Sequence, residues 1–136
     1  MKKAITFSIL ALAASSALAH GPADGRAVMI GQDGADFDAC GGYGEITGLN
    51  PDGDNFLAVR AGPTTQASKV DELHQSDPVW LCDATADGEW IGIVYGESSG
   101  PDRDCQVGEN LSKPVAYHGP CRSGWVSSRY VTLIAG

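Results

Sequence analysis

The chain has 136 residues, with 17 acidic against 9 basic side chains, a formal net charge of −8 at pH 7 and 43% hydrophobic residues. This length suits one domain. The acidic balance disfavours anionic partners, so we expect no binding to nucleic acid or to anionic lipid. An acidic surface would favour a basic partner, although solubility alone is the more common reason for acidity.

Residues 1–19 have the features of a secretory signal peptide. Lys2-Lys3 is a charged start, residues 5–12 are mostly apolar, and Ala17-Leu18-Ala19 is the small-x-small pattern of a cleavage site. The apolar run is shorter than the roughly 20 residues that span a bilayer. We therefore expect an exported chain, periplasmic or extracellular, that does not span a membrane and starts at His20 when mature.

Four cysteines, Cys40, Cys82, Cys105 and Cys121, occur in this chain. An even number in an oxidising compartment indicates two disulfide bonds. The residues alone leave three pairings open. No Cys-x-x-Cys pair occurs, which argues against a tetrahedral zinc site and against a thioredoxin-like redox site.

The mature chain divides into a leader and one domain. Residues 20–40 are rich in Gly, Ala and Asp and have no sustained period, which predicts a flexible leader. Residues 41–136 are expected to form the ordered domain. Within it, residues 96–120 are a polar stretch with three prolines, longer than most loops in compact domains, and we interpret them as an insert.

Short runs in the ordered part have the patterning of strands. Leu57 and Val59 alternate with Ala58 and Arg60, which gives one apolar face, and Gly62-Pro63 forces a turn. Val70 and Leu73 are expected to face inward across a brief turn. Further strands are predicted at residues 45–49, 79–82, 90–95, 124–126 and 131–134, with a hairpin turn at 86–89 and one helical turn at 127–130. The expected fold class is all-β, a small barrel of about five to six short strands.

Three motifs occur in a characteristic order. They are Leu57-Ala58-Val59-Arg60-Ala61-Gly62-Pro63, then Trp90 at a hairpin exit, then Gly124-Trp125-Val126-Ser127-Ser128-Arg129-Tyr130-Val131. In these motifs the chain resembles the bacterial SH3-like (SH3b) domains, roughly from Gly48 to Ile134. The resemblance implies an SH3-like barrel. The cysteines and the insert depart from the family's pattern, in which a short hairpin joins the strands that flank the insert here.

The resemblance also implies a disulfide pairing. If the strands that flank the insert are neighbours, the ends of the insert lie close together and Cys105 pairs with Cys121. Cys40 would then pair with Cys82 and tie the leader to the central strand. In the chain-entropy model, closing the loop of the insert contributes about 3 kcal/mol. Such links are useful because small barrels have thin cores.

Signatures of catalysis and of metal binding are weak. A Cys–His nucleophile would need a free thiol of Cys105 or Cys121 beside His118, which the expected disulfide opposes. The acidic turn at residues 50–55 lacks the glycine and glutamate of a calcium-binding loop. We expect no enzyme and no cofactor. The amine and ring of His20 at a mature N-terminus form a possible copper chelate, which stays open as an alternative.

Aromatic side chains are the candidates for a ligand-binding surface. The candidate residues are Trp90, Tyr95, Tyr117, His118, Trp125 and Tyr130. Trp90 and Trp125 fit a role in the core equally well. Tyr117, beside His118 in the insert, is expected to be exposed. We expect the insert to form one wall of the recognition surface, with Tyr117 as its aromatic anchor.

The resemblance implies a non-enzymatic binding module of the bacterial cell envelope. SH3-like domains of this class direct many enzymes to peptidoglycan or contact short peptides. The expected partner is therefore peptidoglycan or an envelope protein or peptide. Two alternatives stay open, an acidic inhibitor of a basic hydrolase and the copper site on His20. The sequence does not indicate an oligomeric state.

We predict that export removes residues 1–19. The Ala17-Leu18-Ala19 pattern places the cleavage after Ala19. Intact-mass measurement of the exported protein should give the mass of residues 20–136 with two disulfide bonds. An exported protein that retains its amino-terminal segment would contradict this prediction.

Overall fold

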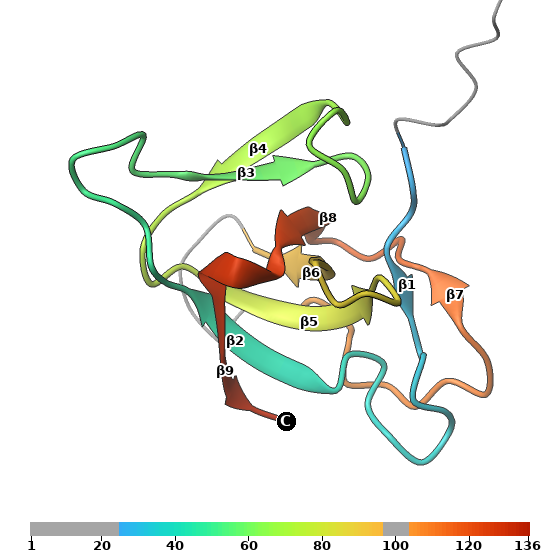
Figure 1. The fold of residues 1–136 in the computed structure, drawn as a ribbon. Helices are drawn as coiled ribbons and strands as arrows, with labels where there is room; N and C mark the ends of the chain where they lie inside the picture. The colour runs from blue at the N-terminus through green and yellow to red at the C-terminus, as the bar shows by residue number, and fades with distance from the viewer. Residues whose placement is uncertain (1–24, 97–103) are drawn as a thin grey trace, which may run out of the picture.

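The structure, a computed structural model, describes residues 25–96 and 104–136. The predicted signal peptide and His20 lie outside these residues. The described chain forms a seven-stranded and a two-stranded antiparallel sheet (Figure 1), so the expected all-β class is confirmed. None of the helical segments in these ranges has the length and apolar character that crossing a membrane requires.

The large sheet has the strand order β4-β3-β8-β6-β5-β2-β9. Its strands are β2 (Gly42–Ile46), β3 (Leu57–Arg60), β4 (Lys69–Leu73), β5 (Pro78–Ala84), β6 (Trp90–Tyr95), β8 (Arg122–Ser127) and β9 (Val131–Ala135). The 3-10 helix η2 (Ser128–Tyr130) connects β8 to β9. The small sheet pairs β1 (Met29–Ile30) with β7 (Val115–Ala116).

Sequence periodicity predicts several of these strands correctly. β6 has the predicted bounds, and β3 buries Leu57 and Val59 as its alternation indicates. The strand predicted at residues 45–49 is β2, which starts earlier, at Gly42, because Gly42 and Tyr43 pair with β5. The brief turn expected around Val70 is the edge strand β4, which pairs with β3. Its alternation buries Leu73 and leaves Val70 53% exposed, so Val70 does not face inward.

Two apolar clusters cover opposite faces of the central strands. The inner cluster comprises Ile46, Leu57, Val59, Leu73, Val79, Ile93, Tyr95 and Val126. Successive side chains of a strand point to opposite faces, so Ile93 and Val94 of β6 belong to different clusters. Both of these side chains are fully buried. The middle of the large sheet is therefore covered on both sides.

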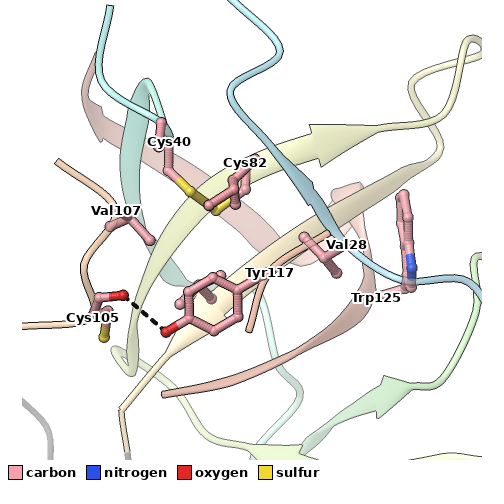
Figure 2. Packing of buried hydrophobic residues seen from close by; sticks show 10 residues of the cluster. Val28, Cys40, Cys82, Cys105, Val107, Tyr117 and Trp125 are labelled. Carbon is pink, nitrogen blue, oxygen red and sulfur yellow. Dashed lines mark hydrogen bonds between the residues drawn. A yellow bond between two sulfur atoms is a disulfide. The ribbon is translucent and has the colours of Figure 1, made fainter. Parts of the chain in front are cut away.

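The outer cluster packs residues 25–40 and 104–120 on the other face of the sheet (Figure 2). Its members are Val28, Ile30, Ala39, Cys40, Cys82, Val94, Cys105, Val107, Tyr117 and Trp125. Val28 is only 2% exposed, and β1 pairs with β7. The prediction of a flexible leader is therefore wrong for residues 25–40. These residues are rich in Gly and Asp, and the few apolar side chains among them form no periodic pattern that would have predicted their packing on the outer face of the sheet.

Residues 25–40 and 104–120 form an outer layer on the sheet, and two disulfide bonds hold this layer in place. Cys40–Cys82 joins the N-terminal segment to β5 (Figure 2). Cys105–Cys121 closes the loop between these two residues. Both pairings are those implied by the resemblance, and they are confirmed. All four cysteines lie in the described ranges, and none of them is free.

Asp83 of β5 provides a polar attachment for the N-terminal segment. Its Oδ2 accepts a hydrogen bond from the Met29 N–H at 3.0 Å, and its Oδ1 accepts one from Gln32 Nε2 at 3.1 Å. The side chain is 8% exposed and lies opposite Gly92, where a Cβ would sit 2.8 Å from the Cβ of Asp83. The same Cβ would lie 3.1 Å from Val28 Cγ1, so β5 and the N-terminal segment together leave room only for glycine at this position.

We expect Asp83→Ala to lower the free energy of unfolding by about 2 kcal/mol, because it leaves the Met29 N–H without its charged acceptor. Urea denaturation of the mature protein with intact disulfides measures this loss. Asp52→Ala is the matched control, since Asp52 lies in an exposed turn. Equal stability of the two variants would show that Asp83 does not anchor the segment.

Candidate functional site

A cavity of about 390 Å³ opens where β4 and the loop after it meet the ends of β6 and β8. Its lining residues are Asp71, Glu72, Leu73, His74, Asp77, Pro78, Tyr95, Gly96 and Arg122. The sheet brings these residues together because β4 is joined through β3 to β8, and β8 pairs with β6. A concave site with a few converging polar groups is the usual form of a ligand site.

A hydrogen-bonded network centred on Asp71 forms one wall of the cavity. The Tyr95 hydroxyl and Arg122 Nη1 both donate to Asp71 Oδ2, each at 2.9 Å. The Glu72 N–H donates to Asp71 Oδ1 at 2.8 Å. Tyr95 and Arg122 are direct partners in the β6–β8 register, so the sheet itself sets their spacing. Three strands thus fix the position of one carboxylate.

The network perturbs the titration of two of its members. Burial alone would raise the pKa of Asp71, but the hydrogen bonds from Glu72, Arg122 and Tyr95 outweigh it and hold that pKa below its ordinary value of 3.8. Burial, and then the neighbouring Asp71, raise the pKa of Tyr95 well above its ordinary value of 10.0. Near neutral pH, Asp71 is therefore a carboxylate and Tyr95 a hydrogen-bond donor.

The loop between β4 and β5 forms the opposite rim, and its backbone is tightly constrained. Asp77 Oδ2 accepts a hydrogen bond from the His74 N–H at 2.7 Å, and the Asp77 N–H donates to the His74 carbonyl at 3.0 Å. Ser76 has a φ of 69° and donates its N–H to the Ile46 carbonyl at 2.7 Å. A positive φ is uncommon for residues other than glycine and persists only where the surrounding contacts hold the backbone in place. The loop thereby presents the exposed His74 side chain at the rim.

Carboxylates outnumber cationic groups around the cavity. Asp71, Glu72 and Asp77 contribute three acidic groups, whereas Arg122 contributes one basic group that is already paired with Asp71. Glu72 also forms an ion pair with Lys69 on the same strand. The arrangement suits a ligand that brings a positively charged group into the cavity.

The aromatic residues predicted as candidates have different roles in the structure. Tyr95 lines the cavity. Trp125 is completely buried, and its indole N–H donates to the Arg26 carbonyl at 2.7 Å. Trp90 packs against the outer cluster and Tyr130 against the inner one. Trp125 therefore belongs to the core and does not form a contact surface.

The prediction that Tyr117 is an exposed anchor is wrong. The residue is 9% exposed, and its hydroxyl donates to the Cys105 carbonyl at 2.9 Å (Figure 2). The same hydroxyl accepts a hydrogen bond from the Cys121 N–H at 3.0 Å. The ring fills the loop that the Cys105–Cys121 bridge closes. The neighbouring His118 is exposed and, with Glu109, lines a separate hollow of about 340 Å³.

The cavity residues Asp71, His74 and Arg122 were not predicted from the sequence. Asp71 and Arg122 are 51 positions apart and meet only through the pairing of three strands, β4, β3 and β8. The sequence offered one signal, the charged residue Asp71 in a short run that the structure shows to be the strand β4.

The metal-binding alternative gains no site from the described residues. Across residues 25–96 and 104–136, no three or more His, Cys, Asp or Glu side chains are grouped so that they could hold a metal ion. His20, on which the copper alternative depends, lies outside these ranges.

Comparisons with protein-family models, with curated proteins and with solved structures found no match to this chain. A proposal about function therefore depends on the fold and on the geometry of the cavity.

We expect the stabilising effect of Asp71 to disappear in acid. Its pKa is lower in the folded than in the unfolded chain, so its ionised form stabilises the fold above pH 3.8 and the effect is lost as the pH falls through the lowered value. The difference in unfolding free energy between the parent and Asp71→Asn should be largest near neutral pH and shrink in acid. Asp52→Asn, in an exposed turn, should show no such trend. A difference that does not vary with pH would contradict the network.

Proposed function

We propose that this chain is a non-enzymatic, exported binding module with an SH3-like barrel, and that the cavity between β4, β6 and β8 is its ligand site. The observation that carries the proposal is the convergence of Asp71, Tyr95 and Arg122 from three strands on one concave surface. Ligand sites typically combine such a hollow with a few fixed polar groups and perturbed pKa values.

The ligand class follows from the charge of the site. An ammonium or guanidinium group would approach the carboxylates of Asp71, Glu72 and Asp77, while Leu73 and Pro78 supply apolar contact for the rest of the ligand. We propose a short peptide segment with a cationic side chain, either in an envelope protein or in the peptide part of peptidoglycan. The net charge of −8 supports the same class through long-range attraction.

An acidic inhibitor of a basic hydrolase is the second candidate. The net charge of −8 favours it, because electrostatic attraction speeds the association of oppositely charged proteins. Such an inhibitor would bind one basic protein tightly, and binding would weaken strongly as salt is added.

A peptide titration tests the main proposal. The mature protein is titrated with a lysine-containing peptide and with the same peptide acetylated on lysine, and chemical shifts are followed by NMR. We expect resonances of Tyr95 and His74 to shift, and the acetylated peptide to bind about tenfold more weakly because it lacks the charge. Soluble peptidoglycan fragments are titrated in parallel.

Two variants of the cavity and one control make the test specific. Glu72→Gln and His74→Ala change side chains at the rim, and both should weaken peptide binding. Glu89→Gln removes the same charge as Glu72→Gln from an exposed position outside the cavity. Equal binding of both peptides would contradict a cationic ligand. Equal effects of Glu72→Gln and Glu89→Gln would show that binding depends on the net charge of the protein and not on the cavity.

A further inference from the structure

The two edge strands of the large sheet differ in charge. β4 carries Lys69, Asp71 and Glu72, whereas β9 contains no charged residue. β9 lies at the other end of the strand order, at the margin of the molecule in Figure 1. Its Leu133 and Ile134 side chains are 59% and 55% exposed.

This difference affects how each edge meets other strands. An edge strand presents unpaired N–H and C=O groups on which another strand can pair, and charged residues on the edge normally discourage such pairing. β4 has this protection. β9 lacks it, and in the described part of the chain it pairs with β2 alone and exposes apolar side chains beside its other edge, so that edge is open to pairing.

The two ends of β9 have opposite charges nearby. Arg129 is exposed just before β9, and within residues 25–96 and 104–136 it forms no ion pair. At the other end, Ala135 pairs with Tyr43, close to Gly41. A Cβ at Gly41 would lie 2.8 Å from Asp33 Oδ2, so the Asp33 carboxylate marks this end.

We propose that two copies of this chain associate by antiparallel pairing of β9 with β9 about a two-fold axis. In that arrangement the start of each strand lies beside the end of the other, so Arg129 of each copy approaches Asp33 of its partner. The contact is self-complementary, as a two-fold interface must be. It also lets two acidic chains meet along a strip that carries no charge.

The pairing goes beyond the proposed function and does not depend on it. No β9 residue lines the cavity between β4, β6 and β8, so that cavity stays available in each copy. A contact of one short strand is small, and the dimer is therefore weak and depends on concentration. A dimer with two cavities would bind a repetitive surface more tightly than one copy does.

Sedimentation velocity of the mature protein from micromolar to millimolar concentration tests the proposal. The parent should shift from monomer to dimer within this range. Ile134→Lys should weaken the dimer by about tenfold or more, because it places a charge on the β9 edge. Val70→Lys is the matched control on β4, with similar exposure, and should leave the dimer unchanged.

A charge exchange tests the geometry of the pairing. Arg129→Asp and Asp33→Arg should each weaken the dimer, and the double variant should recover it because the attraction is restored with reversed signs. Amide hydrogen exchange should show protection of β9 that increases with protein concentration, with no such change in β4.

A parent that stays monomeric up to millimolar concentration would overturn the proposal. So would a dimer that tolerates Ile134→Lys but not Val70→Lys. Additive losses in the double charge variant would exclude the antiparallel arrangement. Peptide binding to the cavity is measured separately, so failure of one proposal leaves the other intact.

Discussion

Burial of the central strands on both faces is the constraint on which the rest of this structure depends. β6 places Ile93 and Val94 on opposite sides, and both are fully buried. The strands of the large sheet themselves supply the side chains of the inner cluster, whereas the outer face needs a separate cover. Residues 25–40 and 104–120 supply that cover, so two segments that the sequence indicated to be a leader and a loop contribute to the core.

The outer layer contains little regular secondary structure. Disulfide bonds and hydrogen bonds hold it in place instead. Among the residues that the structure describes, its only sheet is the pair of two-residue strands β1 and β7. Cys40–Cys82, Cys105–Cys121 and the hydrogen bonds to Asp83 attach each part of the layer to the sheet or to itself. Such links are common where a small domain cannot gain enough stability from apolar burial alone.

Local sequence patterns predicted the strands whose burial depends on residues close together in the sequence. The alternation of Leu57 and Val59 and the run from Trp90 to Tyr95 predict β3 and β6. The resemblance implied the correct disulfides. The burial of Val28 and Tyr117 depends on contacts between distant segments, which leave no periodic signal. The cavity was missed for the same reason, because Asp71, Tyr95 and Arg122 converge only after the strands have paired.

The pairing of β1 with β7 also bears on how fast this protein folds. These strands lie near opposite ends of the described chain, and strands β2 to β6 of the seven-stranded sheet lie between them in the sequence. Contacts between residues so far apart slow folding, because the chain entropy is lost before the contact forms. We therefore expect the β3–β4 and β5–β6 hairpins to form early and the outer layer to close last. Until it closes, the chain exposes the outer face of its central sheet, and this is the stage at which it is most prone to aggregate.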